Sequence, residues 1–423
     1  MERFRITGGA TLSGDVVVSG SKNAAASIIP ATVLTDEDCV IHNMPKIDDV
    51  VCLLEILEKM GASVQWTDEH TVKINTANLD PSRLEHSLIE KIRMSVLLSG
   101  PLLVRFGRVS MTKPGGCSIG SRPISTHLSA LEKLGALPVD SDDTIVLEAP
   151  KGLKGVDIVL QEISVTATEN TCLAAARAQG TTTISLAAAE PHVYDCLTVL
   201  EKMGAQISGK GTHELSILGA NTLSGFEHTL IADPIEVGTF LVAGALLGEV
   251  RVTNAAPEFM KRELLAFEDA GIPVTVEKSA ITAKKPKKIR PLGAIQSLPY
   301  PGFPSDLLPP FALLMTQAEG TTMVHETLYE GRLRNYIPEL QNMGANAVIC
   351  DPHRALITGK TLLTGKTMMS FDLRAGATLI LAALVAEGES VIDNIAQIDR
   401  GYENIDKKLT ALGAHIVREE NNS

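Results

Sequence analysis

One short phrase recurs six times along the 423-residue chain, at nearly equal spacing. Each copy reads as the end of an amphipathic helix, then a glycine, then a β-branched strand, which is typical of a helix that stops at a left-handed residue. The spacing between successive glycines is 67 to 74 residues, which predicts six copies of one structural unit of about 70 residues. The glycines are Gly61, Gly135, Gly204, Gly271, Gly344 and Gly413.

A second element, a strongly apolar helix followed by a polar turn and a strand, also recurs in every unit. A helix that is apolar nearly all round must be buried on most of its sides. Three such helices per domain, facing inward and ringed by sheets, satisfy that requirement. We therefore predict an α/β fold of two domains with three units each. The apolar helices are expected at 23–34, 92–104, 167–178, 235–247, 306–317 and 374–386.

Composition excludes several classes of protein. A chain of 423 residues is too long for one ordinary core, which also favours two domains. The net charge of −12 argues against nucleic acid or an anionic membrane as the main partner, although local cations could still bind a small anion. The longest apolar runs are too short to span a bilayer, and the charged opening MERFRITGG does not read as a signal sequence.

The cysteine pattern favours reduced thiols in the cytoplasm over a disulfide framework or a zinc site, because no two cysteines have the CxxC spacing. The six cysteines are Cys39, Cys52, Cys117, Cys172, Cys196 and Cys350.

Side chains capable of chemistry cluster at or just before the starts of the apolar helices. A helix start presents unpaired N–H groups and a partial positive charge, so it is a natural anion site, and we expect the six starts to converge on one cleft. For the carboxylates, helix capping is the simpler interpretation. Lys22 and Arg374 differ, because a cation there is unfavourable by about 0.3–1 kcal/mol, and we expect a ligand phosphate or carboxylate to compensate. The clustered residues are Lys22, Asn23, Arg93, Ser164, Thr166, Glu169, Asp233, Glu236, Asp306, Asp372 and Arg374.

Residues 113–123, KPGGCSIGSRP, place a lone cysteine between glycines. By itself this stretch reads as a turn that carries a small apolar residue. Together with six other motifs, it makes the chain resemble the enolpyruvyl transferases, and among them the enzymes that act on UDP-N-acetylglucosamine. The motifs run in the expected order through nearly the whole chain: GSKNAA (20–25), PGGCSIGSRP (114–123), SVTATEN (164–170), FPSDL (303–307), YEGR (329–332), DLRAGA (372–377) and IDRGYE (398–403).

The resemblance implies an inside-out α/β barrel with two three-unit domains, residues 22–231 and residues 1–21 plus 232–423, joined by a double crossover. It implies that the enolpyruvyl group of phosphoenolpyruvate moves to the 3-hydroxyl of UDP-N-acetylglucosamine while phosphate leaves. This reaction is the first committed step of peptidoglycan synthesis. No metal, organic cofactor or obligate protein partner is implied.

The resemblance also implies roles for individual residues. Cys117 resembles the general acid that protonates the enol carbon, and Asp306 resembles the base that takes the proton of the sugar hydroxyl. The SIGSRP loop would close over the site and exclude water. The cations of the anion-binding set are Lys22, Arg122 and Arg400 on the phosphate side, completed by Arg332 and Arg374. The other implied substrate contacts are Asn23, Arg93, Pro123, Ile124, Ser125, Thr126, Ser164, Val165, Thr166, Leu328 and Asp372.

Three positions depart from the family pattern, on or near the acceptor side. Ser125 stands where an acidic residue usually contacts the uracil, Leu308 replaces a glutamine, and Gly331 replaces an asparagine. Transfer to a different nucleotide acceptor therefore stays open.

Two different functions are compatible with the same fold. A 3-phosphoshikimate transferase shares the donor but lacks the GGC loop. A non-catalytic paralogue that only binds its ligands would not need Lys22, Cys117, Asp306 and Arg400, all of which are present.

Overall fold

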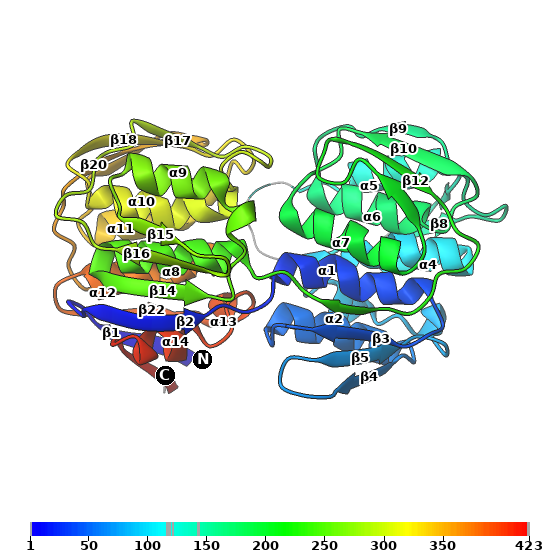
Figure 1. The fold of residues 1–423 in the computed structure, drawn as a ribbon, viewed down its shortest axis with the longest axis horizontal. Helices are drawn as coiled ribbons and strands as arrows, with labels where there is room; N and C mark the ends of the chain where they lie inside the picture. The colour runs from blue at the N-terminus through cyan, green and yellow to red at the C-terminus, as the bar shows by residue number, and fades with distance from the viewer. Residues whose placement is uncertain (1, 116–119, 121, 142–143, 421–423) are drawn as a thin grey trace. The chain divides into compact units, whose positions relative to one another are not determined.

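The computed structural model describes residues 2–115, 120, 122–141 and 144–420, and its strands form six sheets (Figure 1). The described residues divide into two compact bodies. Among the described residues, the first body comprises 2–19, 120 and 232–420, and the second comprises 20–115 and the described part of 122–231.

Each unit contains an inner helix, a strand, an outer helix and further strands. The inner helices are α1 (Lys22–Ala31), α4 (Ser99–Phe106), α6 (Val165–Ala175), α8 (Pro234–Leu247), α10 (Leu308–Thr316) and α12 (Leu373–Val385). The outer helices are α2 (Asp48–Lys59), α5 (Ser125–Lys133), α7 (Pro191–Lys202), α9 (Lys261–Asp269), α11 (Ile337–Asn342) and α14 (Ile405–Ala411). Every outer helix ends two residues before one of the six predicted glycines, whose φ angles lie between 74° and 112°. The prediction of six repeated units is confirmed.

The first body contains three four-stranded sheets, and the amino-terminal segment belongs to two of them. Strand β1 lies between β22 and β23, antiparallel to both, and β2 runs parallel to β14. In sheet order the strands are β21 (Thr367–Met369), β22 (Glu389–Asp393), β1 (Glu2–Thr7) and β23 (His415–Glu420); β15 (Val274–Val276), β16 (Ala280–Lys284), β14 (Gly248–Thr253) and β2 (Leu12–Val17); and β17 (Ala294–Gln296), β18 (Gly320–His325), β20 (Arg354–Gly359) and β19 (Ala347–Asp351).

The second body repeats this plan with two four-stranded sheets and one three-stranded sheet among its described residues. In sheet order its strands are β11 (Gln206–Ser208), β12 (Glu214–Leu218), β10 (Thr181–Ser185) and β9 (Asp157–Val159); β13 (Glu227–Thr229), β3 (Cys39–His42), β5 (Val72–Asn75) and β4 (Ser63–Trp66); and β6 (Arg108–Thr112), β8 (Thr144–Glu148) and β7 (Leu137–Val139).

The inner helices form the cores of the two bodies. Every residue of α8 after Pro234 is buried, and α10 is buried along its whole length. Each fully buried leucine or phenylalanine contributes about 1.5–3 kcal/mol, so these helices fix the interior around which the sheets stand. The inside-out α/β barrel, with helices inside and sheets outside, is confirmed. None of the helices in the described ranges is long and apolar enough to cross a membrane.

The inner segment of the second unit differs from the continuous helix predicted at 92–104. It is a 3-10 helix over Arg93–Leu98, followed by α4. Pro101 has no N–H and its ring crowds the carbonyl four residues earlier, which disfavours an unbroken α-helix. The N–H of Gly100 instead donates to Asn170 Oδ1 at 2.8 Å, and a Cβ at Gly100 would lie 2.5 Å from the Asn170 carbonyl oxygen. A polar side chain of α6 therefore takes over a backbone bond at this break.

Candidate active site

Lys22 is the first residue of α1, directly after the capping residue Ser21, whose hydroxyl accepts the N–H of Ala24. Its ammonium group forms an ion pair with the buried Asp49, with Nζ 2.8 Å from Oδ2. The sequence led us to expect a ligand anion as the compensating charge. In the structure the first turn of α2 supplies a compensating carboxylate, and the ligand anion at Lys22 stays a prediction. Asn23 follows, half-buried, in the first turn of α1.

Arg93, the first residue of the 3-10 helix, anchors the chain that follows the cysteine motif. Its Nη2 donates to the carbonyl oxygens of Arg122 and Pro123, the second at 3.4 Å. Ile124 precedes α5, whose first residue, Ser125, is exposed and whose second, Thr126, is buried. Arg93 therefore fixes the backbone at the positions predicted to contact the substrates.

Cys117 and three of the six residues of the SIGSRP segment, 118, 119 and 121, lie outside the described residues. The role of Cys117 as general acid and the closure of this loop stay predictions.

The start of α6 carries a neutral polar group. Ser164 caps the helix, and Val165 and Thr166 are half-buried in its first turn. His127 of α5 contacts Thr166, with Nε2 2.9 Å from Oγ1. Burial, together with the nearby charge of Arg93, lowers the pKa of His127 to about 3, so its imidazole is neutral at pH 7. The sequence motifs did not single out His127, which comes from a different helix.

Asp306 lies in a 3-10 turn, Ser305–Leu307, just before α10. Its carboxylate accepts hydrogen bonds from Arg332 Nη2 at 2.6 Å and from Arg374 Nε at 2.9 Å. Burial raises the pKa of Asp306, but the charges and hydrogen bonds of Arg332 and Arg374 outweigh burial and hold the pKa well below its usual value. The structure therefore brings three predicted site residues together, and Asp306 is ionised.

A buried carboxylate supports this cluster. Glu326, fully buried after β18, accepts hydrogen bonds from the Ser305 hydroxyl and from the Leu328 N–H, the latter at 2.9 Å. Arg332 Nη1 donates to the same Ser305 hydroxyl. Glu326 thus holds the Ser305 hydroxyl, which is next to Asp306 in the chain and in contact with Arg332. Its sequence context, one glutamate at a strand end, carries no signal that would have identified it.

The two arginines retain donors that the protein does not use. Arg332 and Arg374 are 3% and 2% exposed, and both Arg332 Nε and Arg374 Nη1 lack a hydrogen-bond partner among the described residues. Burial lowers the pKa of each guanidinium, but Tyr402 beside Arg374, and Asp306 beside both arginines, raise the pKa more, so both stay charged. Buried, charged donors without partners are costly, which favours an anionic ligand at this position.

Two aspartates at helix starts act as caps. Asp233 Oδ1 accepts two N–H groups of α8, and Asp372 Oδ1 accepts those of Arg374 and Ala375 in α12. Asp372 Oδ2 also accepts from Asn335 Nδ2 at 2.6 Å, so both of its oxygens are engaged. For these two carboxylates the geometry shows helix capping, which was the simpler interpretation of the sequence.

The remaining predicted residues of the first body are more accessible. Leu328 is exposed, with 43% of its surface accessible. Arg400 is half-buried after α13 (Ala396–Asp399), and its Nη1 lies 3.4 Å from Gln397 Oε1.

Two glutamates of the predicted cluster lie in the interior instead. Glu169 is 2% exposed in the middle of α6, and burial raises its pKa well above the usual value despite a hydrogen bond with Ser27. Glu236 is buried in α8, where it accepts from Lys408 Nζ at 2.6 Å and from the Ser19 N–H at 2.8 Å. Glu169 lies about one turn into α6, which places its carboxyl group in the core. Glu236 is in the first turn of α8, as predicted, but it is buried and paired with Lys408.

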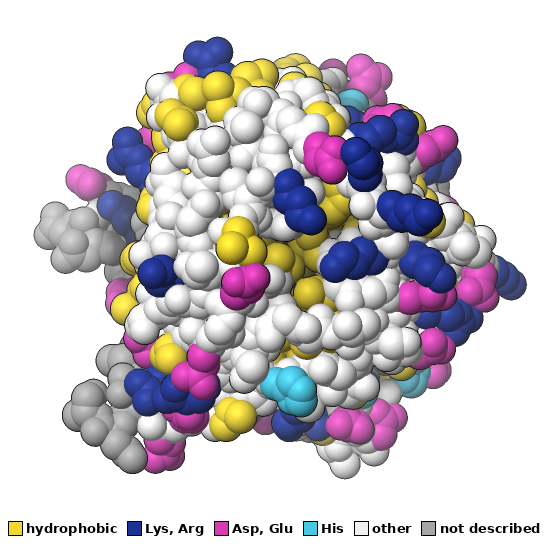
Figure 2. Space-filling model, turned by 90° about the vertical axis from the view of Figure 1, so that its left-hand side faces the viewer, with side chains coloured by type: hydrophobic (Ala, Val, Ile, Leu, Met, Phe, Trp, Pro, Cys, Tyr) yellow, Lys and Arg dark blue, Asp and Glu magenta, His cyan; other side chains and the backbone are white. Residues whose placement is uncertain are grey.

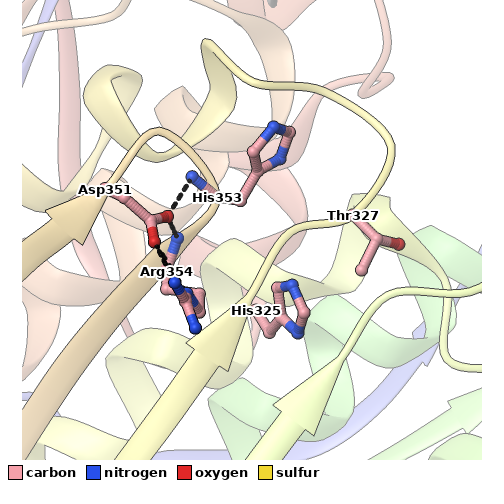
Figure 3. Close-up of a pocket in the computed structure, with 5 residues that line it drawn as sticks. All are labelled: His325, Thr327, Asp351, His353 and Arg354. Carbon is pink, nitrogen blue, oxygen red and sulfur yellow. Dashed lines mark hydrogen bonds and ion pairs between the residues drawn. The ribbon is translucent and has the colours of Figure 1, made fainter.

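A separate hollow lies at the edge of the sheet that contains β18, β19 and β20 (Figure 3). In this hollow Asp351 is already paired with Arg354, with Oδ2 2.7 Å from Nε. On the face seen in Figure 2, lysine and arginine side chains lie among aspartates and glutamates. This mixture of charges is not the continuous basic surface that binds a polyanion such as nucleic acid. The described residues contain no group of three His, Cys, Asp or Glu side chains able to hold a metal ion. The hollow is lined by His325, Thr327, Asp351, His353 and Arg354.

Comparison with known proteins agrees with this architecture. The family model described as EPSP synthase (3-phosphoshikimate 1-carboxyvinyltransferase) matches residues 6–409. Two curated relatives are named UDP-N-acetylglucosamine 1-carboxyvinyltransferase. The one from Actinobacillus succinogenes is 42% identical over 99% of both chains, and the one from Treponema denticola is 40% identical over 99% of this chain and 100% of its own.

Solved structures show the same fold. The enolpyruvyl transferase NikO from Streptomyces tendae superposes with a TM-score of 0.89 at 28% identity, covering 99% of this chain and 98% of its own. An EPSP synthase from Acinetobacter baumannii, 19% identical, superposes with a TM-score of 0.77 over 99% of this chain and 100% of its own, which supports the fold alone.

Proposed function

The chain belongs to the EPSP synthase family of enolpyruvyl transferases, and we propose that it transfers the enolpyruvyl group of phosphoenolpyruvate to the 3-hydroxyl of UDP-N-acetylglucosamine, releasing inorganic phosphate. The observation that carries this proposal is the 42% and 40% identity, over essentially the full length, to relatives named for that reaction. The charged cluster around Asp306 supports it, because the chemistry needs an ionised base and cations for an anionic donor.

On the donor side, Lys22, Arg122 and Arg400 bind the phosphate of phosphoenolpyruvate. Arg332 and Arg374 complete the anion-binding set, and their unused donors support this role. Guanidinium groups present planar, paired N–H donors that suit carboxylate and phosphate oxygens.

In the proposed reaction, Cys117 gives a proton to the methylene carbon of the donor, and Asp306 takes the proton of the 3-hydroxyl. The hydroxyl oxygen forms a bond to the central carbon of the donor. The bond from that carbon to the phosphate oxygen then breaks, and the departing phosphate takes up the proton held by Asp306. The methyl carbon returns a proton to the Cys117 thiolate as the double bond re-forms. Asp306 is ionised before the acceptor arrives, although the two arginines that hold its pKa low also weaken it as a base.

On the acceptor side, the segment 123–126 and the start of α6 bind the nucleotide sugar, together with Asn23, Arg93, Leu328 and Asp372. Arg93 supports this role indirectly, because it fixes the backbone of Arg122 and Pro123. We propose residues 22–231 and residues 1–21 plus 232–423 as the two domains of the enzyme.

The proposed place of the reaction is the cytoplasm. Within the described part of the chain, Cys39, Cys172, Cys196 and Cys350 form no disulfide bond, as suits a reducing compartment. There the reaction would commit material to peptidoglycan, on which cell shape and division depend.

Phosphate release with a choice of acceptors tests the proposal. The protein is mixed with phosphoenolpyruvate and, separately, UDP-N-acetylglucosamine, 3-phosphoshikimate or a nucleotide sugar with another base. We expect rapid phosphate release with the first acceptor and none with 3-phosphoshikimate. Binding of both substrates without phosphate release would support a non-catalytic, ligand-binding role. Phosphate release only with another nucleotide sugar would show that the protein is an enolpyruvyl transferase with a different acceptor.

Covalent labelling tests the acid separately. An epoxide phosphonate that mimics the donor, such as fosfomycin, should alkylate Cys117. Burial raises the pKa of Cys39 to about 12 and also raises the pKa values of Cys172 and Cys196, so these thiols are poor nucleophiles. The exposed Cys350 is the internal control. Peptide mapping that finds the label mainly on Cys350 would contradict the role of Cys117.

A further inference from the structure

A chain of hydrogen bonds joins helices α4, α6 and α5 of the second body and ends at the start of α6. Asn170 Nδ2 lies 2.9 Å from Ser99 Oγ and 3.3 Å from His127 Nδ1, and His127 Nε2 lies 2.9 Å from Thr166 Oγ1. Ser99, Asn170 and His127 are 4%, 0% and 2% exposed, whereas Thr166 is half-buried. The chain therefore runs from the core to an accessible hydroxyl.

The contacts at the inner end set the direction of every bond. Gly100 N–H donates to Asn170 Oδ1 at 2.8 Å, so the Nδ2 amide group is the one that faces Ser99 and His127. The hydroxyl of Ser99 donates to the Val96 carbonyl oxygen at 2.7 Å and therefore accepts from Asn170.

The amide group of Asn170 also fixes the tautomer of His127. Because His127 Nδ1 faces the Asn170 amide donor, Nδ1 is the acceptor, and the ring hydrogen of the neutral imidazole is on Nε2. Nε2 therefore donates to Thr166 Oγ1. The hydrogen of the Thr166 hydroxyl is then available to a further acceptor.

Thr166 differs in this respect from the other threonines of α6. Thr168 and Thr171 donate to the carbonyl oxygens of Ser164 and Ala167, four residues earlier, at 2.8 and 2.7 Å. Those hydroxyls are used within the helix. Thr166, in the first turn, instead receives a hydrogen bond from a different helix.

We propose that His127 is a positioning residue, which holds the Thr166 hydroxyl so that it donates to an oxygen of the nucleotide sugar. This inference rests on the proposed function, which places Thr166 among the acceptor contacts. A diphosphate oxygen is the favoured partner, because the N–H groups and partial positive charge at the start of α6 attract the same anion. His127 acts through Thr166 and does not touch the reacting atoms.

We call the hydrogen bonds that lead from Ser99 through Asn170 and His127 to Thr166 the neutral relay. Four single variants test the relay by steady-state kinetics. His127→Leu removes the donor, and Thr166→Val removes the hydroxyl at nearly constant shape. Each should raise the KM for UDP-N-acetylglucosamine about tenfold, as expected for one lost hydrogen bond to a charged group. His127→Gln can place an amide donor near the position of Nε2, and Thr166→Ser keeps the hydroxyl, so both should stay within about threefold of wild type.

The double variant His127→Leu/Thr166→Val separates positioning from a merely structural role. If His127 acts through Thr166, the KM of the double variant rises about tenfold, like each single variant, whereas independent effects would multiply to about a hundredfold. The kcat and the KM for phosphoenolpyruvate should change less than twofold in all variants.

An unchanged KM in Thr166→Val, a multiplicative double variant or no rescue by His127→Gln would overturn the inference. Thr166→Val keeps the test decisive if His127→Leu does not fold, because Thr166 is half-buried. Wild-type turnover of UDP-N-acetylglucosamine, measured in the same series, distinguishes the two levels. Turnover with an unchanged KM in Thr166→Val contradicts only the relay, whereas absent turnover contradicts the proposed function and the relay with it.

Discussion

Equivalent helix starts in the two bodies carry different polar chemistry. Ahead of α10 and α12 in the first body, Asp306 is bound by two buried arginines, Arg332 and Arg374. At the start of α6 in the second body, neutral groups lead through His127 to Thr166. The arginines of an ion pair can exchange their carboxylate for a competing anion when one arrives. Hydrogen bonds between neutral groups keep their donor and acceptor roles whether or not an anion is present.

The difference arises outside the repeated elements themselves. Glu326, at the end of a strand, binds the Ser305 hydroxyl that Arg332 also contacts. Asn170 takes its orientation from the N–H of Gly100, where the inner segment of the second unit changes from a 3-10 helix to α4. The repeated fold therefore sets where polar groups stand, and neighbouring elements decide which chemistry they can perform.

Removing the charge of Asp306 should have the largest effect. Asp306→Asn keeps the shape and can still bind an arginine, but an amide cannot act as a base. We expect kcat to fall by about two to four orders of magnitude, the usual contribution of a positioned general base. Phosphate release measures the rate, and calorimetry should show that UDP-N-acetylglucosamine still binds. Asp351→Asn, at an exposed pair with Arg354, is the control and should keep full activity. Equal losses in both variants would contradict the specific role of Asp306.

Removing the cation at the start of α1 tests whether the second body also contributes to donor binding. Lys22→Ala should lower kcat/KM for phosphoenolpyruvate about 10- to 100-fold, the cost of one charge-assisted hydrogen bond. The variant also removes the ion-pair partner of the buried Asp49 and so lowers stability. The double variant Lys22→Ala/Asp49→Asn removes that second charge. It should regain stability in urea unfolding without regaining donor use. Near-normal kinetics in Lys22→Ala would remove this residue from the site.

The charged cluster should also contribute to stability. Arg374→Met removes a guanidinium that is 2% exposed and leaves Asp306, whose side chain is 29% exposed, with one arginine fewer. Water reaches Asp306 in part, so we expect a loss of about 2 kcal/mol, below the full cost of breaking a buried pair. Arg354→Met, which breaks the exposed pair with Asp351, should cost less than about 1 kcal/mol. Similar urea midpoints for the two variants would show that burial does not distinguish these pairs.

The neutral relay should appear in the pH dependence of stability. The folded pKa of His127 is lowered to about 3, below the ordinary value of 6.5, by burial and by the charge of Arg93. Below pH 6.5 the unfolded chain binds a proton that the folded protein refuses. The stabilisation is therefore complete above pH 6.5 and is lost as the pH falls, by up to about 1.4 kcal/mol per pH unit.

His127→Gln should remove this contribution, so its free energy of unfolding should fall less steeply than that of wild type between pH 6.5 and 4. Parallel curves in urea titrations at several pH values would show that His127 is not the group responsible.

The sequence predicted the fold well because its main signals are local. An apolar segment such as 235–247 must be buried, and a glycine such as Gly413 must end its helix, whatever the rest of the chain does. Site residues are harder to identify, because their partners come from distant positions. Asp49, Glu326 and His127 stand in unremarkable local sequence, and only the packing of other elements brings them to Lys22, Ser305 and Thr166.

The identity of the product tests the central claim most directly. The protein is incubated with phosphoenolpyruvate and UDP-N-acetylglucosamine, and the nucleotide sugar is purified for mass spectrometry and for NMR. We predict that one phosphate is released for each nucleotide sugar that gains an enolpyruvyl group, with a long-range proton–carbon correlation joining sugar carbon 3 to the new enol ether. A nucleotide sugar recovered unchanged, or one modified at another hydroxyl, would contradict the account.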